Sequence, residues 1–196
     1  MSDAITHFDA LYRANPDPWD YQSSTYEARK YAATLAALTQ PHYRTIIEPG
    51  CSIGVLSAGL AARCDRLVAL DFSPVAVRQA KLRLARFSGS TANIAKLPQD
   101  WPEGRYDLIM LSELIYYLAA PEIIALAHLV ARDATAQAEC VIIHYQGDTE
   151  TDVKPDEAQD LFCQTLAETR SFAITDHLQS TDYSHRTLIF LPAAHF

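Results

Sequence analysis

Two acidic residues flank a glycine-containing segment in the first half of the chain. Glu48 begins the segment, which runs to Gly54, and Asp71 follows the first glycine, Gly50, by about 20 residues. Glycines allow a backbone to approach a ligand closely, and an acid at this distance accepts hydrogen bonds from ribose hydroxyls. The types and the spacing of these residues therefore predict a nucleoside-binding site.

The flanking sequence supplies the elements that such a site requires. Residues 43–47 and 66–71 predict two buried strands. Residues 55–64 between them predict a short amphipathic helix, with Leu56 and Leu60 on one face. A strand, a glycine turn, a helix and a second strand place the free amides of the helix N-terminus beside the ligand.

The rest of the chain alternates predicted strands and helices. Capping residues predict helix starts at Ser24, with Glu27 completing a capping box, and at Ser73. The other expected elements are strands at 91–95, 106–112 and 139–144, helices at 121–132 and 156–168, and a closing hairpin at 172–178 and 186–191. This order predicts an α/β fold with a mostly parallel sheet, an antiparallel C-terminal hairpin with one reversed strand at the edge, and helices on both faces.

Length and composition limit the classes of function. The 196 residues fit a single domain, with a cap segment and helix in residues 1–40 and an α/β core in residues 41–196. The net charge of −8 disfavours a nucleic-acid partner, because phosphate backbones bind basic surfaces. No apolar run reaches membrane-spanning length, no secretory signal is visible, and the four cysteines lack metal-binding spacing. We therefore expect a cytoplasmic protein, monomeric or homodimeric, with neither a metal nor a membrane partner.

Two classes of ligand share this arrangement, dinucleotides and S-adenosylmethionine (SAM). The dinucleotide loop needs G-x-G-x-x-G, but its second and third glycines would fall at Ser52 and Val55. That loop also gives no role to a leading acid, whereas the cationic amino group of SAM gives Glu48 a partner. The loop therefore favours SAM, with contacts expected from Glu48, Gly50, Ser52, Gly54 and Asp71.

Four stretches resemble the class I SAM-dependent methyltransferases, and more closely the nodulation protein S (NodS) family. They are Asp17 to Trp19, Tyr26-Glu27 with Arg29, Glu48 to Gly54, and Asp107 to Leu118. The resemblance implies a Rossmann-like, seven-stranded sheet, SAM over the strand ends with S-adenosylhomocysteine (SAH) as product, and methyl transfer to nitrogen. It implies as acceptor a small amine, such as an amino sugar at the end of a chitin-type oligosaccharide. The alternatives are O-methylation, a nucleotide-binding oxidoreductase and a non-catalytic SAM-binding protein.

The resemblance also assigns further residues to the cofactor. It implies a cap over SAM that contains Trp19 and Tyr26, although both rings could instead belong to a hydrophobic core. Arg29 on the same segment is implied to pair with the SAM carboxylate. Further cofactor contacts are implied for Phe72, Leu97 and Ser112.

Two segments depart from the family pattern or leave a choice open. Where many relatives carry an acid near the adenine, this chain has Lys96, and Asp100 is a substitute. The polar segment 148–156 carries four acids, which could meet a cationic amine, although a solvated loop is the commoner explanation. The adenine contacts and the acceptor contacts are therefore less defined than the loop at Glu48.

Three residues near the ends of two later strands are candidates for the chemistry. Glu113 and Tyr117 follow the fourth predicted strand and share a face of a helical turn, and His144 ends the fifth strand. Open α/β sheets bind ligands at such strand ends, so we expect Glu113 or His144 to accept the proton of an amine. Tyr116 is the alternative to Tyr117 as the tyrosine that orients the amine, and a structural role is the alternative for His144.

Overall fold

Strands and helices alternate along the chain as the apolar pattern predicts. The computed structural model describes residues 8, 10–147, 149, 151–179 and 182–192. The chain divides into two compact units, residues 1–95 and 96–196. Within the described ranges, no helix combines the length and the apolar character needed to cross a lipid bilayer.

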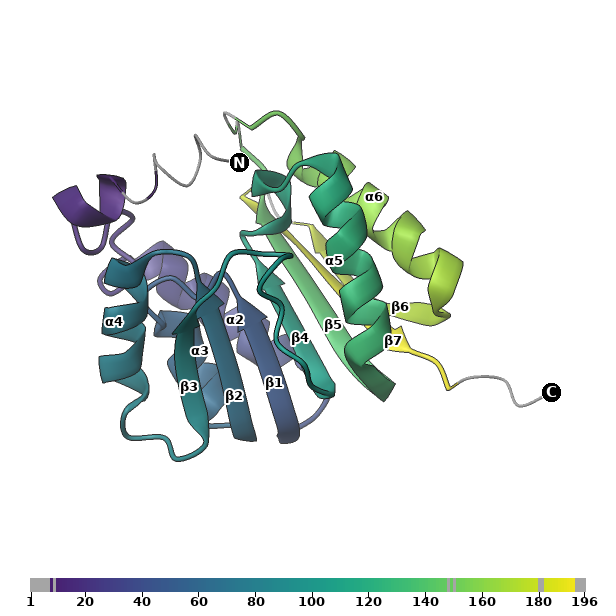
Figure 1. Ribbon diagram of the computed structural model, residues 1–196, viewed down its shortest axis with the longest axis horizontal. Helices are drawn as coiled ribbons and strands as arrows, with labels where there is room; N and C mark the ends of the chain where they lie inside the picture. The colour runs from purple at the N-terminus through teal and green to yellow at the C-terminus, as the bar shows by residue number, and fades with distance from the viewer. Residues whose placement is uncertain (1–7, 9, 148, 150, 180–181, 193–196) are drawn as a thin grey trace. The chain divides into compact units, whose positions relative to one another are not determined.

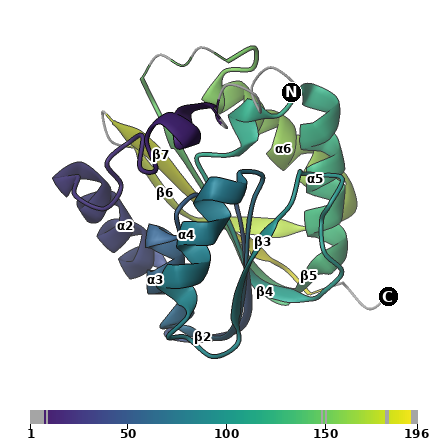
Figure 2. The same ribbon diagram turned by 60° about the vertical axis from the view of Figure 1, so that its left-hand side comes forward.

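The first unit contains a parallel sheet with the strand order β3-β2-β1. The helices of this unit lie beside these strands (Figures 1 and 2). The bounds are α2 (Thr25–Ala37), β1 (Tyr43–Pro49), α3 (Val55–Ala61), β2 (Cys64–Asp71), α4 (Pro74–Leu84) and β3 (Ser90–Ile94). Ile46, Ile47 and Leu67 are fully buried, which agrees with the near-continuous apolar runs of parallel strands.

The predicted helix starts in this unit are confirmed at both serines. The Ser24 hydroxyl accepts a hydrogen bond from the Glu27 amide at 3.2 Å, and the Ser73 hydroxyl accepts one from the Ala76 amide at 3.4 Å. The second half of the capping box is not formed. The Ser24 amide instead donates to the Asp20 carbonyl at 2.8 Å, and the Glu27 carboxylate accepts a hydrogen bond from Lys30 Nζ at 3.0 Å.

The second unit contains four strands in the order β4-β5-β7-β6. Its elements are β4 (Tyr106–Ser112), the 3₁₀ turn η1 (Ile115–Tyr117), α5 (Ala120–Asp133), β5 (Ala134–Tyr145), α6 (Pro155–Thr169), β6 (Phe172–Gln179) and β7 (Tyr183–Phe190). The β4 and β5 strands are parallel, and α5 and α6 lie side by side (Figure 1).

The predicted antiparallel C-terminal hairpin is confirmed, because β6 pairs with β7 in antiparallel register from Phe172 to Gln179. The expected position of the reversed strand at the sheet edge is wrong. The reversed strand β7 lies one position inward, since it also pairs with β5 from Glu139 to Tyr145. The chain passes from β5 through α6 to the edge strand β6. The next strand, β7, then returns between β6 and β5.

Candidate functional site

The glycine loop of the first unit has a left-handed backbone at three positions. Gly50, Ser52 and Gly54 have φ angles of +76°, +50° and +79°. A Cβ atom at Gly54 would lie 3.0 Å from Ala80 Cα, so a side chain there would require α4 to shift slightly and would also strain the left-handed backbone. Serine adopts the same region at Ser52, at a cost in backbone strain.

Asp71 ties this loop to the start of α4. Its Oδ2 accepts a hydrogen bond from the Ser52 amide at 2.9 Å, and its Oδ1 accepts one from the Ser73 amide at 2.9 Å. Burial raises the pKa of Asp71 to about 6, although the backbone amides oppose that shift. The predicted ribose acceptor is therefore a buried carboxyl group that is already oriented by two backbone donors.

Glu48 is buried at the end of β1 with unused hydrogen-bonding capacity. Only 3% of the residue is exposed, and its Oε2 atom has no hydrogen-bond partner. Burial raises the pKa of Glu48 to about 8, and the nearby Ser57 hydroxyl opposes part of that rise. The Ser57 hydroxyl is itself buried without a hydrogen bond of ordinary geometry. A buried acceptor without a donor is costly, so this carboxyl group fits the cationic amino group of SAM.

Aromatic residues of the N-terminal segment gather near the same loop. The Trp19 ring centroid lies 5.5 Å from that of Tyr12 and 5.8 Å from that of Phe8, whose ring is 6.2 Å from Phe72. Tyr12 is 4% exposed and its hydroxyl hydrogen-bonds the Ser52 hydroxyl. Trp19 and Phe72 are thus brought to one cluster, as a cap over the loop requires.

Sequence reasoning missed Tyr12, although a signal for it exists. Phe8 and Tyr12 are four residues apart, the spacing that places two side chains on one face of a helix. Residues 10–14 are helical, and Tyr12 packs against Ile53 and Ala76. We expected the first helix to begin at Ser24, so this earlier helical turn was missed.

The cationic residues of α2 are placed differently from one another. Arg29 is exposed on the helix surface, whereas its neighbour Lys30 is 4% exposed and pairs with Glu27. Lys30 Nζ also lies 5.4 Å from the ring centroid of Tyr26, a residue that is 37% exposed. The pairing of Arg29 with the SAM carboxylate stays a prediction.

In the second unit, Glu113 lies directly after β4 in a left-handed conformation, with a φ angle of +52°. Its Oε2 accepts hydrogen bonds from the Tyr116 hydroxyl at 2.7 Å and from the Tyr145 amide at 2.9 Å. Tyr116 is 3% exposed and Tyr117 is half-buried, with 4.3 Å between their ring centroids. The structure thus joins Glu113 to the alternative tyrosine, Tyr116.

His144 is fully buried near the end of β5. Its Nε2 lies 3.0 Å from Oδ1 of Asp156, in the first turn of α6, and its Nδ1 has no hydrogen-bond partner. One acid of the polar segment 148–156 therefore contacts His144, and two others, Asp148 and Glu150, lie outside the described residues. The His144 pair links the strand to the helix that follows it.

The other residues predicted from the sequence, Leu97, Asp100 and Ser112, lie in the first part of the second unit. Leu97 is 7% exposed, and Ser112 is the half-buried last residue of β4. Asp100, the proposed substitute near the adenine, accepts a hydrogen bond from the Lys96 amide at 2.9 Å through its Oδ2. The carboxylate of Asp100 therefore stabilises its own turn.

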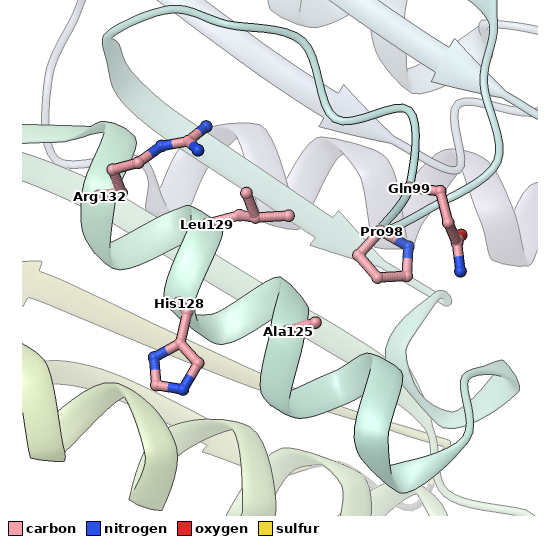
Figure 3. Close-up of a pocket in the computed structure, with 6 residues that line it drawn as sticks. All are labelled: Pro98, Gln99, Ala125, His128, Leu129 and Arg132. Atoms are coloured by element: carbon pink, nitrogen blue, oxygen red, sulfur yellow. The ribbon is translucent and has the colours of Figure 1, made fainter.

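A shallow groove of about 490 Å³ lies on the same unit, between α5 and the segment at Pro98 and Gln99. Figure 3 shows Ala125 and Leu129 directed toward that segment, while His128 points away from it. None of the predicted cofactor or catalytic residues lines the groove. We therefore describe two candidate regions, the glycine loop of the first unit and the ends of β4 and β5 in the second.

Comparisons with known proteins identify the family and the fold of the chain. The family model of nodulation protein S (NodS) matches residues 9–144. Nodulation protein S of Sinorhizobium fredii is 28% identical over 117 residues, which are 58% of this chain and 54% of that protein. Nodulation protein S of Rhizobium tropici is 29% identical over 106 residues, 54% of this chain and 44% of that protein. The chain spans about half the length of the curated relatives it matches.

Solved structures extend the likeness to most of the chain. A candidate methyltransferase from Pseudomonas syringae is 37% identical, with a TM-score of 0.70 over 85% of this chain and 99% of that one. The N-methyltransferase NodS from Bradyrhizobium japonicum, bound to SAH, is 20% identical, with a TM-score of 0.77 over 92% and 96% of the two chains. This likeness confirms the predicted Rossmann-like fold. Since the family model also covers more than half of the chain, the protein belongs to the NodS family of SAM-dependent methyltransferases.

Proposed function

We propose that this protein transfers the methyl group of SAM to the nitrogen of a small amine or amino sugar. The observation that carries the proposal is the buried Glu48 carboxyl group with an unpartnered Oε2, in a glycine loop that Asp71 holds in place. A methyl donor with a cationic amino group and a ribose matches both acids. Membership of the NodS family supports nitrogen as the acceptor atom.

The first unit would hold the methyl donor. SAM supplies an electrophilic methyl group on a sulfonium, and the protein contributes chiefly alignment and exclusion of water. We assign the amino group of the donor to Glu48, its ribose to Asp71, and the cover over it to the aromatic cluster of Trp19 and Phe72. Contacts from Tyr26, Arg29, Gly50, Ser52, Gly54, Leu97 and Ser112 remain part of this proposal.

Glu113 is the residue that we assign to the acceptor. An amine must lose a proton to become a neutral product, and a carboxylate held in a fixed orientation can accept that proton or orient the amine. The Tyr116 hydroxyl and the Tyr145 amide fix the Glu113 carboxylate, and Tyr117 adjoins Tyr116. We therefore place Glu113 and Tyr117 in contact with the acceptor.

We propose a positioning role for His144. Its imidazole is fully buried and its Nε2 pairs with Asp156, so we assign it a positioning role rather than contact with the acceptor. It acts in the proposal as the residue that fixes the start of α6. The net charge of −8 favours a small or cationic acceptor over a nucleic acid, and we propose a monomer or homodimer.

A methyl-acceptor screen tests the proposal. The purified protein is incubated with SAM and separate sets of primary amines, amino sugars, chitin-type oligosaccharides with a free terminal amine, phenols and alcohols. We expect a mass increase of one methyl group on an amine or amino sugar, which is lost in Glu113→Gln. Methylation of phenols or alcohols alone would assign the protein to O-methylation, and binding of SAM without any turnover would reject the catalytic assignment.

A further inference from the structure

An arginine of α4 contacts two parts of the first unit that are distant from it in sequence. The Arg83 guanidinium donates a hydrogen bond from Nη1 to the carbonyl oxygen of Ile53, in the glycine loop. Its Nη2 donates to the side-chain oxygen of Gln22 at 2.8 Å. Arg83 is half-buried, and the two acceptors lie 30 and 61 positions away in the chain. One planar guanidinium therefore joins the glycine loop to the N-terminal segment.

Gln22 ends a compact turn, residues 15–22, which we call the cap turn because it carries Trp19. The Asp17 carboxylate organises this turn. Its Oδ1 accepts a hydrogen bond from the Tyr21 amide at 2.8 Å, and its Oδ2 accepts one from the Gln22 amide at 3.0 Å. The ring centroids of Trp19 and Tyr21 are 5.6 Å apart. Because these contacts hold the turn together, an attachment at either end also positions Trp19.

A second residue of α4 attaches the other end of the cap turn. Gln79 Nε2 donates a hydrogen bond to the carbonyl oxygen of Pro16 at 2.7 Å, across 63 positions of the chain. Gln79 and Arg83 are four residues apart, so both side chains lie on the same face of α4. The segment before α2 accordingly lies beside α4 in Figure 2. This face of α4 thus holds the cap turn at two points, one on each side of Trp19.

The glycine loop is also held at both ends of α4. Asp71, just before the helix, accepts a hydrogen bond from the Ser52 amide. Arg83, in the last turn of the helix, donates to the carbonyl oxygen of the following loop residue, Ile53, which is fully buried. Both the loop and the cap turn are therefore fixed to one helix, and Arg83 is the side chain that contacts both of them.

The contacts between the cap turn and α4 are exposed to solvent. This holds for the hydrogen bond at Gln22 and for the one at Pro16, and Trp19 is 37% exposed. An exposed hydrogen bond contributes little net stability, because water replaces the lost partner when the bond opens. The cap turn can therefore separate from α4 without unfolding of the unit, as a cover must do when a ligand enters or leaves.

We propose that Arg83 is a positioning residue for the methyl donor, which holds the cap turn closed against the glycine loop, with Gln79 as the second attachment. The inference rests on the proposed donor site at the glycine loop. Arg83 acts through Gln22 and Ile53 rather than by contact with the donor. The strength of this bridge then sets how long a donor or its product stays bound.

Three substitutions separate the bridge from its parts. Arg83→Ala removes both contacts, and Gln22→Ala removes only the acceptor in the cap turn. Arg83→Lys keeps the positive charge but replaces the planar fork of donors with a single ammonium group. Arg78→Ala is the matched control, because Arg78 is an exposed arginine of the same helix.

Stopped-flow fluorescence measures the rate at which SAH leaves each variant. We expect release to be about fivefold to twentyfold faster from Arg83→Ala than from the wild type, and about threefold to tenfold faster from Gln22→Ala. The double variant should release SAH no more than about twofold faster than Arg83→Ala, because both residues act through one contact. Arg83→Lys should stay within about twofold of Arg83→Ala, and Arg78→Ala within about twofold of the wild type.

Hydrogen–deuterium exchange of the ligand-free protein tests the attachment itself. In Arg83→Ala and in Gln22→Ala, the amides of residues 15–22 should exchange faster than in the wild type, whereas those of β1 should not change. Circular dichroism identifies a variant that does not fold. If Arg83→Ala is such a variant, Gln22→Ala decides the question, because Gln22 is exposed.

Three results would overturn the inference. Release of SAH at the wild-type rate from both Arg83→Ala and Gln22→Ala would show that the bridge does not retain the ligand. Faster release without faster exchange in the cap turn would assign the loss to the glycine loop alone, and multiplied losses in the double variant would show that the two residues act separately. Absence of any SAH binding by the wild type would instead reject the proposed function, on which the inference depends.

Discussion

Two buried acids of the first unit and two acids of the second, the half-buried Glu113 and the buried Asp133, differ in how they are satisfied. In the first unit, Glu27 and Glu48 each keep one oxygen without a hydrogen-bond partner. In the second unit, Glu113 Oε2 accepts two hydrogen bonds, and Asp133 accepts bonds from Trp101 at 2.8 Å and from Arg132 at 2.8 Å. Two buried carboxyl groups of the first unit thus keep an oxygen that could accept a further donor, whereas these acids of the second unit, like Asp71 of the first, are fixed by hydrogen bonds within the chain.

This contrast distinguishes acids that could bind a ligand from acids whose orientation is already fixed. Unsatisfied buried carboxyl groups favour a ligand that brings its own positive charge, and they are costly without it. A satisfied carboxylate, in contrast, keeps its orientation whether or not a ligand is present, as preorganised catalytic groups do. We therefore expect substitutions in the first unit to change donor binding and substitutions at Glu113 to change turnover.

The largest expected effect is on turnover, from Glu113→Gln. Glutamine keeps an acceptor for the Tyr116 hydroxyl and the Tyr145 amide but cannot take a proton, so kcat should fall about 100-fold to 1,000-fold. The affinity for SAH, measured by calorimetry, should change by less than about twofold. A comparable loss of SAH affinity would break the separation between the units.

Asp71→Ala should have the next largest effect, this time on donor binding. The change removes the ribose acceptor and both hydrogen bonds to the amides of Ser52 and Ser73, so SAH affinity should fall about 30-fold to 100-fold. Asp65→Asn serves as the control, because Asp65 is an exposed carboxylate of the same unit that pairs with His42. Near-wild-type SAH binding by Asp71→Ala would mean that the ribose is held by other residues.

Glu48→Gln should stabilise the ligand-free protein while weakening SAH binding. The pKa of Glu48 is raised from 4.5 to about 8 in the folded protein, so its contribution to stability is complete below pH 4.5 and is lost as pH rises toward 8. The variant should therefore unfold at a higher temperature than the wild type, and the difference should grow between pH 5 and pH 8.

Thermal unfolding at several pH values checks this expectation. Glu113→Gln, which replaces a carboxylate that already accepts two hydrogen bonds, should show no such gain and provides the comparison from the second unit. If the difference in unfolding temperature between Glu48→Gln and the wild type did not depend on pH, the pKa of Glu48 would not be raised by burial.

The smallest expected effect is on stability in the second unit, from Tyr116→Phe. Loss of the hydrogen bond to Glu113 should lower the free energy of unfolding by about 1 kcal/mol, because the hydroxyl is buried. Urea unfolding measures the change, with Tyr145→Phe as the control, because the Tyr145 residue is 44% exposed and meets Glu113 only through its backbone amide. An equal loss in the control would show that the Tyr116–Glu113 contact has no special weight.

Local patterns in the sequence were sufficient to predict the fold. Apolar runs placed β1, β2 and β4 to within a few residues, and serine caps located α2 and α4, because strand burial and helix capping depend on residues close in sequence. The start of β5 was missed by five residues. Its first part, Ala134–Ala138, includes polar and exposed side chains that do not form an apolar run.

Side-chain partners were harder to predict, because they depend on contacts between distant segments. The bond between Tyr12 and Ser52 joins residues 40 positions apart, and the amide of Tyr145 reaches Glu113 across 32 positions. Helical spacing suggested Tyr117 beside Glu113, but the turn is a 3₁₀ helix and presents Tyr116 instead. The types of residue at the site were predictable, whereas their pairings required the tertiary structure.

The central claim is that the first unit binds a methyl donor that carries a ribose and a cationic amino acid. Calorimetric titration of the wild-type protein with SAH and, separately, with NAD tests it most directly. We predict saturable binding of one SAH per chain and NAD binding at least about 100-fold weaker, since NAD offers no ammonium group to Glu48. Binding of NAD as tight as that of SAH, or no binding of SAH, would contradict the account.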